Sequence, residues 1–181
     1  MTKLNDLVSN NKVQTYGFPA FKGLEEHGQK EGNEIVISTL SPAIMADMGI
    51  NTYYAPVIPR DSRFNTTDEV IAAGLDANLI NVSKVSDYGF KRKVIVTRHQ
   101  GTLAILKEMY PDAEVMTGNV SKDDIDGAYV IGVLPPHLVQ YAIAYQAATI
   151  KDFDYAKDGD LSGEELKDRL EICEPISVEV K

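Results

Sequence analysis

Three segments of the chain repeat one order of elements, and this repetition is what most constrains the fold. Residues 35–48, 94–109 and 130–145 each read as an apolar strand, a short polar or proline-containing turn, and a helix. Strands that alternate with helices predict an α/β fold, Rossmann-like, with a mostly parallel sheet flanked by helices. Ligands of such sheets bind at the carboxyl ends of the strands. The residues expected along that edge are Ser38, Thr39, Thr97, Arg98, His99, Gly132, Leu134, Pro135, Pro136 and His137.

Capping residues, glycines and prolines set the bounds of the other expected elements. Ser41 followed by Pro42 is a typical helix start, and Ser162 with Glu165 predicts a capping box. We expect strands at 34–37, 79–85, 93–97, 113–116, 129–133 and 174–180. We expect helices near the start of the chain and at 43–48, 68–73, 102–109, 138–149 and 163–170. Residues 1–33 are expected to form a polar N-terminal segment, and residues 34–181 the α/β domain.

Composition excludes several classes of protein. The formal charge of −9 over 181 residues argues against a general DNA or RNA coat, because such proteins make many phosphate contacts. It still allows one small nucleotide held by a few local cations. A lone cysteine, Cys173, fits a reducing compartment, and no apolar run approaches the roughly 20 residues of a membrane helix. Residues 1–11 have no signal-peptide core, so a cytoplasmic protein is expected.

His99 and Arg98, directly after the clearest strand, are the first candidates for chemistry. A histidine titrates near neutral pH and can act as acid or base, and an adjacent arginine can hold a phosphate. Gly101 would let a ligand approach the backbone, and the helix from Thr102 would offer N–H groups to an anion. The alternative is a turn with an exposed Arg–His pair. His137 is a candidate ligand contact rather than a catalytic residue.

Metal and nucleotide motifs are weak or absent. Residues 154–165 fit most positions of a calcium loop, but the third position is Ala156, which has no side-chain oxygen. An acidic turn with a capping box is therefore favoured there. Three scattered histidines and one cysteine give no zinc spacing. The chain has no phosphate loop, no dinucleotide fingerprint and no serine-hydrolase turn.

Three short motifs stand in the second half of the chain, namely Val96–Thr102 (VTRHQGT), Val130–Leu138 (VIGVLPPHL) and Asp160–Leu166 (DLSGEEL). Together they resemble the small CRISPR-associated ring nucleases of type III systems. The His-x-Gly-Thr turn and the late helix start are also similar to viral anti-CRISPR ring nucleases. The resemblance covers residues 93–172, about half of the chain. Thr117–Asn119 stand where the family pattern has His-Leu-Asp, and residues 34–90 are a candidate degenerate repeat.

The resemblance implies cleavage of a cyclic oligoadenylate, with the tetra-adenylate as first candidate, without metal or cofactor. A ribose 2′-hydroxyl would attack its own 3′-phosphate and leave a 2′,3′-cyclic phosphate. His99 would transfer the proton and Arg98 would steady the phosphate. A homodimer would match the two-fold ring, or, with an internal duplication, a single chain would supply both halves of the site. The implied ligand-binding residues are Ser38, Thr39, Thr97, Gly101, Thr102, Gly132, Leu134, Pro135 and His137. The alternatives are a sponge or sensor that binds without cutting, a calcium-binding interaction protein, and an unrelated α/β domain.

Overall fold

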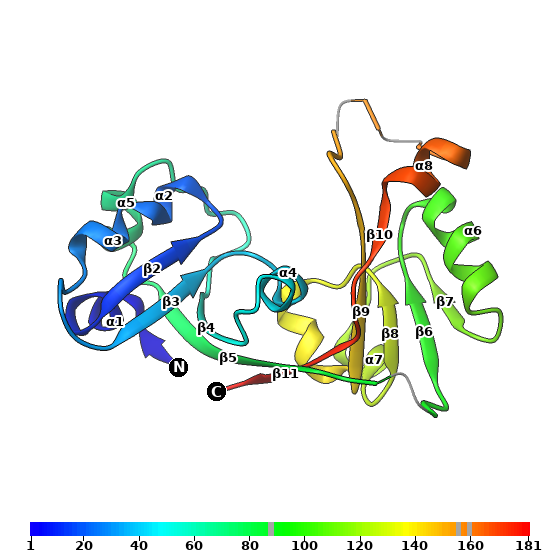
Figure 1. Ribbon diagram of the computed structural model, residues 1–181, viewed down its shortest axis with the longest axis horizontal. Coiled ribbons are helices and arrows are strands. Elements are labelled where there is room, and N and C mark those ends of the chain that lie inside the picture. Colours follow the sequence, from blue (N-terminus) through cyan, green and yellow to red (C-terminus); the bar gives the residue numbers. More distant parts are fainter. Residues whose placement is uncertain (87–88, 155–156, 159–160) are drawn as a thin grey trace. The chain divides into compact units, whose positions relative to one another are not determined.

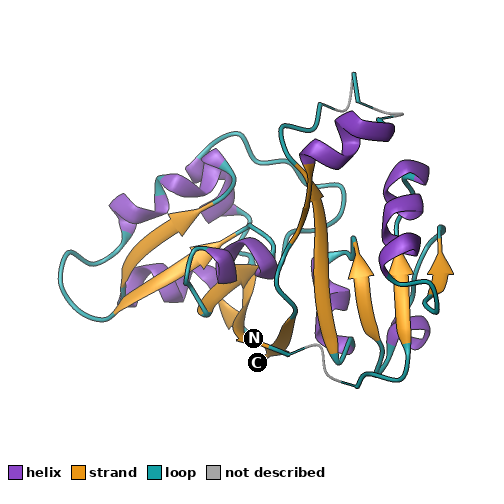
Figure 2. Cartoon of the chain, turned by 45° about the vertical axis from the view of Figure 1, so that its right-hand side comes forward, coloured by secondary structure: helices purple, strands orange, loops and turns teal. Residues whose placement is uncertain are grey.

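The computed structural model describes residues 1–86, 89–154, 157–158 and 161–181 (Figure 1). The chain divides into two compact units, which we describe separately. Unit 1 contains residues 1–82 and 179–181, and unit 2 contains residues 83–178. Each unit is a sheet of mostly parallel strands flanked by helices (Figure 2). The predicted α/β class is therefore confirmed, and the strand arrangement is compatible with a Rossmann-like fold.

Unit 1 is built on three parallel strands. Strands β2, β3 and β4 lie side by side in that order, and β5 is antiparallel to β4. The short β1 is antiparallel to β5. The strands are β1 (Thr2–Lys3), β2 (Lys12–Tyr16), β3 (Glu34–Ser38), β4 (Thr52–Pro56) and β5 (Asp76–Lys84). The helices are α1 (Leu4–Asn10), α2 (Pro19–Lys22), α3 (Leu24–His27), α4 (Pro42–Asp47) and α5 (Thr67–Ala72).

Local sequence explains where these helices begin. The Ser41 hydroxyl accepts a hydrogen bond from the Ile44 amide at 3.4 Å, and Pro42 occupies the first position of α4, as predicted. Thr66 caps α5 in the same way, through the Glu69 amide at 3.3 Å. The helices then bury Leu4, Leu24 and Val70 completely in the core of unit 1.

Residues 1–33 are more ordered than their polar composition indicates. They contain the expected first helix, α1, but also β2, α2 and α3. Each residue of β2 pairs with one of β3, from Lys12 opposite Glu34 to Tyr16 opposite Ser38. The structure thus joins this segment to the strand that follows, and it divides the chain near residue 82 rather than near residue 33.

Unit 2 is built on four parallel strands in the order β7, β6, β8, β9, with β10 and β11 antiparallel to β9. The strands are β6 (Lys93–Val96), β7 (Glu114–Met116), β8 (Tyr129–Gly132), β9 (Ala144–Ile150), β10 (Leu170–Ile172) and β11 (Ile176–Val180). The helices are α6 (Gln100–Met109), α7 (Lys122–Ile125), a 3-10 helix (Pro136–Tyr141) and α8 (Gly163–Arg169). Leu106 of α6 packs on Ile95, Tyr129 and Ile131 of the sheet.

Two sequence predictions in unit 2 are wrong. The helix expected at 138–149 is a 3-10 helix followed by β9, because Ala144, Ala147 and Ala148 are buried in the sheet beside β8. The helix preference of alanine yields here to tertiary pairing. The capping box of α8 is also absent: the Ser162 side chain makes no cap hydrogen bond, and Glu165 lies 3.6 Å from Arg169.

Among the described residues, no helix combines the length and apolar character required to cross a bilayer.

Candidate functional site

The turns after β6 and β8 meet at the carboxyl edge of the unit 2 sheet. Val96 pairs with Gly132, and the Val133 amide donates to the Val96 carbonyl at 2.8 Å. The structure therefore brings Thr97, Arg98 and His99 next to the turn that begins at Gly132. The other two predicted edge residues, Ser38 and Thr39, end β3 and belong to unit 1, so the site of unit 2 is described without them.

His99 is held close to the sheet by its own turn. Its amide donates to the Thr97 hydroxyl at 3.1 Å, and its ring lies edge-on to Phe153 with centroids 6.4 Å apart. Both imidazole nitrogens are buried, and neither has a hydrogen-bond partner among the described residues. Leaving a buried polar group unsatisfied costs about 1–3 kcal/mol. Such an unsatisfied group calls for a functional or structural reason.

Arg98 points away from the core and meets the turn after β7. Its guanidinium donates to the Asn119 side-chain oxygen at 2.5 Å, and both residues are exposed. This contact adds Asn119 to the candidate site. The sequence itself predicts no role for Asn119, which stands where the ring-nuclease pattern has another residue. The available signal was its position, at the carboxyl end of a third parallel strand.

The turn after β8 depends on a glycine and a tyrosine. Gly132 has φ +123°, and a Cβ there would lie 2.1 Å from the Val96 carbonyl oxygen, so a side chain is excluded. The buried Tyr145 hydroxyl donates to the Gly132 carbonyl at 3.0 Å and accepts from the Leu134 amide at 3.2 Å. Burial raises the pKa of Tyr145 to about 12. Sequence reasoning missed Tyr145 because it placed this residue in a helix.

The remaining predicted residues of unit 2 divide into buried and exposed. Thr102 and Leu134 are buried, whereas Pro135 and His137 are exposed. Gly101 has a structural reason of its own: a Cβ there would lie 2.6 Å from Leu166 and 2.8 Å from the Leu161 carbonyl oxygen. The glycine expected to admit a ligand therefore admits the segment that leads into α8.

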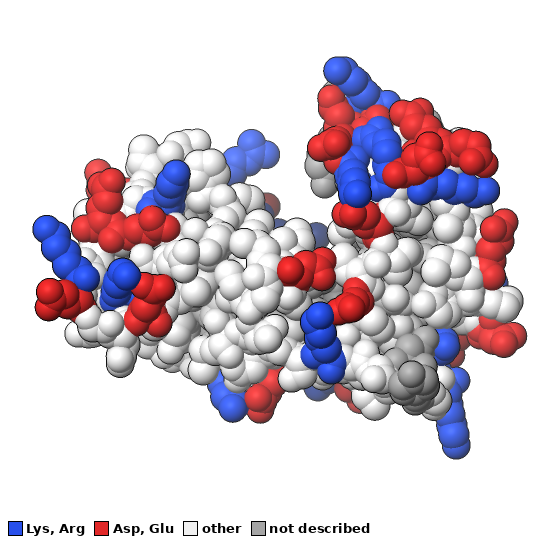
Figure 3. Space-filling model, in the orientation of Figure 1, with Lys and Arg blue, Asp and Glu red and all other residues white. Residues whose placement is uncertain are grey.

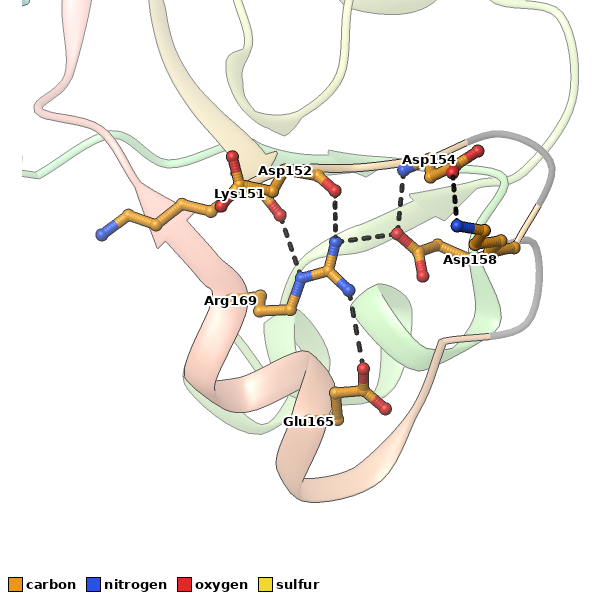
Figure 4. Close-up of polar contacts among 7 residues, drawn as sticks. Lys151, Asp152, Asp154, Asp158, Glu165 and Arg169 are labelled. Atoms are coloured by element: carbon orange, nitrogen blue, oxygen red, sulfur yellow. Dashed lines mark hydrogen bonds and ion pairs between the residues drawn. The ribbon is translucent and has the colours of Figure 1, made fainter.

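The acidic segment before α8 is organised by an arginine (Figure 4). The Arg169 guanidinium donates to the carbonyls of Lys151 and Asp152 at 2.9 and 2.6 Å. It also donates to the Asp158 carboxylate at 2.7 Å, which in turn accepts from the Asp154 amide at 2.8 Å. Charged side chains of both signs gather in this region (Figure 3). These bonds, first the one from Arg169, hold the pKa of Asp158 below its usual value.

The contacts of Arg169 disfavour the interpretation of residues 154–165 as a calcium loop. Arg169 contacts two carbonyls and a carboxylate, which are the oxygen types that calcium uses as ligands. Within the described part of the chain, no group of three or more His, Cys, Asp or Glu could hold a metal ion. Ala156, Gly159 and Asp160 of the expected loop lie outside the described residues.

A pocket of about 490 Å³ lies elsewhere in unit 2. It is lined by Lys84, Val85, Ser86, Tyr129, Gln146, Glu174 and Pro175. Tyr129 is the first residue of β8, so this pocket is at the amino end of the parallel strands and is separate from the candidate site.

Comparisons of the chain with protein-family models, with curated proteins and with solved structures find no match.

Proposed function

We propose that unit 2 binds and cleaves a cyclic oligoadenylate at the carboxyl edge of β6 and β8, with the cyclic tetra-adenylate as the first candidate. The observation that carries the proposal is the pair of buried His99 nitrogens, which have no hydrogen-bond partner within the described part of the chain, next to the exposed guanidinium of Arg98. A phosphodiester with its ribose offers acceptors and donors for the His99 nitrogens, and further acceptors for the Arg98 guanidinium, which already donates to Asn119. Ligands of α/β sheets bind at this edge.

The proposed reaction is an internal transesterification. The ribose 2′-oxygen attacks the adjacent 3′-phosphorus, so a 2′-O–P bond forms and the P–O5′ bond breaks. The 2′-hydroxyl loses its proton, and the departing 5′-oxygen gains one. His99 transfers one of these protons and a water molecule transfers the other, and Arg98 stabilises the charge that develops on the phosphate oxygens. The product is a linear oligoadenylate with a 2′,3′-cyclic phosphate end.

Three residues serve the geometry of this reaction. Asn119 orients the Arg98 guanidinium, and Thr97 fixes the backbone of His99. Tyr145 holds the Gly132–Leu134 turn, which would line the ligand. Alignment of reacting atoms supplies a large part of the rate enhancement of such reactions, so these contacts matter although they transfer no proton.

The ligand also has consequences for assembly and location. A cyclic tetra-adenylate is two-fold symmetric, and a homodimer of the chain would present one unit 2 edge to each half. Cyclic oligoadenylates of type III CRISPR defence are second messengers made inside the cell, so we place the protein in the cytoplasm.

The test is incubation of the purified protein with cyclic tri-, tetra- and hexa-adenylate in EDTA, followed by chromatography and mass spectrometry. We expect linear products with a 2′,3′-cyclic phosphate. His99→Ala should lower the rate about 10²–10⁴-fold, as loss of acid–base catalysis does. His27→Ala is the matched control and should retain the wild-type rate.

Two other outcomes would replace this proposal. Intact ring that is released only after denaturation would identify a sponge that binds the ring without cutting it. Failure to bind or cut any of the rings would refute both readings.

A further inference from the structure

The two units share one order of strands and helices. In unit 1, β2, β3 and β4 are parallel and β5 is antiparallel; in unit 2, β6, β8 and β9 are parallel and β11 is antiparallel. A short helix connects the second and third strands of each set, namely α4 in unit 1 and the 3-10 helix in unit 2. A further helix, α5 or α8, precedes the antiparallel strand. Unit 2 adds β7, α7 and β10, and unit 1 adds β1, α1 and α3.

Equivalent positions face equivalent partners in the two sheets. The matched pairs are Ile37–Tyr54 with Ile131–Gln146, and Tyr53–Ile80 with Tyr145–Ile176. Tyr53 and Tyr145 are both buried, and burial raises the pKa of each. Val70 of α5 and Leu166 of α8 each stand four residues after the N-cap and are completely buried. Topology, register and burial thus agree that the units are two copies of one fold.

The helix that follows the first parallel strand, α2 or α6, lies close to the start of α5 or α8 in each unit. A Cβ at Gly23, the last-turn cap of α2, would lie 2.4 Å from the Thr67 hydroxyl at the start of α5. A Cβ at Gly101 of α6 would meet the segment that starts α8, at Leu161 and Leu166. Each unit therefore has a glycine where α2 or α6 approaches the start of α5 or α8, at the end of α2 in unit 1 and in the first turn of α6 in unit 2.

The two copies differ at the edge where unit 2 has its candidate site. Between β6 and α6 stand Thr97, Arg98 and His99, whereas only Gly17 and Phe18 stand between β2 and α2. The residue that caps the helix is His99 in unit 2 and Phe18 in unit 1, and Phe18 is 57% exposed. A phenylalanine neither transfers a proton nor binds a phosphate.

The hydroxyl groups at this edge of unit 1 already have partners. The Thr39 hydroxyl accepts from the Phe18 amide at 2.8 Å. The Ser38 hydroxyl accepts from the Leu40 amide at 3.0 Å and donates to the Met45 sulfur at 3.0 Å. The turn after β3 therefore stabilises itself, and neither turn of this edge, residues 17–18 or 39–41, contains a charged residue.

We infer that unit 1 is a duplicate of unit 2 that no longer binds the ligand, so each chain has one ligand edge and a two-fold ring is bound by the unit 2 edges of two chains. The inference rests on the proposed function for the identity of the ring. It assigns Ser38 and Thr39, two expected ligand contacts, to the stability of unit 1 instead.

The test uses the full chain and the 2′-O-methyl form of cyclic tetra-adenylate, which lacks the attacking hydroxyl and stays intact. Native mass spectrometry gives the number of rings per chain, and calorimetric titration gives Kd. We expect one ring per two chains. Arg98→Ala should weaken binding about tenfold or more, as loss of a charged hydrogen bond does. Thr39→Ala should leave Kd within twofold, with Thr39→Ser as a control that keeps the hydroxyl.

Each result separates the two claims. One ring per chain, or a loss of affinity in Thr39→Ala equal to that in Arg98→Ala while Thr39→Ser binds normally, would overturn the inference and leave the proposed ligand intact. No binding of the ring by the wild-type protein would overturn the proposed function and this inference with it. Thermal melting of each variant shows whether an altered Kd reflects unfolding.

Discussion

His99 has both imidazole nitrogens buried without a partner among the described residues, while its backbone amide is well bonded to Thr97. Folding therefore removes these two nitrogens from water without giving them a hydrogen-bond partner among the described residues, which lowers the stability of the folded state. Residues at functional sites often carry such a cost, because the missing partner is supplied by the ligand. Arg98 differs from His99 in that its charged group is exposed. One nitrogen of its guanidinium donates to Asn119.

Replacing His99 with phenylalanine should separate stability from activity. His99→Phe removes two unsatisfied nitrogens and keeps a ring next to Phe153, so it should leave the protein as stable or up to about 1 kcal/mol more stable. Ring cleavage should be lost. Urea unfolding measures the stability, and His137→Phe, at an exposed position, should stay within about 0.5 kcal/mol of wild type. Destabilisation of more than 1 kcal/mol by His99→Phe would mean that the imidazole is satisfied in solution.

Tyr145→Phe should show the value of one buried hydroxyl. The Gly132 carbonyl and the Leu134 amide each lose a partner, so the free energy of unfolding should fall by about 1–3 kcal/mol at pH 7. The expected kinetic effect is a lower kcat with little change in KM, because the turn is mispositioned rather than removed. An unchanged free energy of unfolding would contradict the role given to this hydroxyl.

The free energies of unfolding of the wild type and Tyr145→Phe should become more similar at alkaline pH. The folded pKa of Tyr145, about 12, lies above the usual value of 10, so the unfolded chain ionises first. Wild-type stability from this group is full below pH 10 and falls toward pH 12, by up to about 1.4 kcal/mol per pH unit. Tyr145→Phe has no such loss, and Tyr53 is the same in both proteins. Denaturation at pH 8 to 11.5 should therefore show a narrowing difference; a constant difference would refute the raised pKa.

At the scale of elements, two sets of contacts hold α8 and the segment before it against the rest of unit 2. One is the glycine of α6 that admits Leu161 and Leu166; the other is the set of bonds around Arg169. The sequence predicts the position of α8 well, although the capping box of Ser162 and Glu165 on which that prediction rests does not form. It cannot predict the contacts of Arg169, because they include two backbone carbonyls whose position depends on the end of β9.

Gly101→Ala should loosen α8. The added methyl would meet Leu166 and the Leu161 carbonyl at 2.6 and 2.8 Å, and overpacking of this kind costs about 1–3 kcal/mol. Gly118→Ala is the matched control, because no atom lies within 4 Å of its Cβ position. Protease cleavage before α8 should accelerate in Gly101→Ala alone. Equal cleavage in both variants would show that α8 does not depend on this contact.

Asp158 should contribute stability that disappears in acid. Its pKa is lowered, first by the hydrogen bond from Arg169 and then by the one from the Asp154 amide. The contribution is therefore present above the unfolded pKa of about 4 and is lost as pH falls through the folded value. Asp158→Asn should lie below wild type in melting temperature at pH 7 and approach it at pH 3. Calcium should not raise the melting temperature of either protein; a calcium-dependent rise lost in Asp158→Asn would restore the calcium-site reading.

At the scale of the whole molecule, the chain is two α/β units with a common order of elements rather than one domain with three repeats. The predicted strand–turn–helix segments at 35–48 and 94–109 are confirmed in outline, and the one at 130–145 is not. The repeat of unit 1 in unit 2 could not be recognised from the sequence, because two of its strands, β2 and β9, do not have a typical strand pattern. In β2, polar Gln14 and Thr15 interrupt the apolar pattern of a strand, and in β9 three alanines favour a helix. The carboxyl edge of unit 2 was predictable, because Val94–Val96 of β6 and Tyr129–Ile131 of β8 are apolar. The roles of Tyr145 and Asn119 were not predictable, since they depend on hydrogen bonds to the turn after β8 and to Arg98.

The most direct measurement of the central claim is the imidazole spectrum of His99 with and without ligand. The chain has three histidines, so nitrogen NMR of histidine-labelled protein resolves each ring, and His99→Ala assigns the signal. On addition of 2′-O-methyl cyclic tetra-adenylate, the ring nitrogens of His99 should shift as they gain hydrogen-bond partners, while those of His27 stay unchanged. Binding of the ring without any shift at His99 would show that the ligand site lies elsewhere.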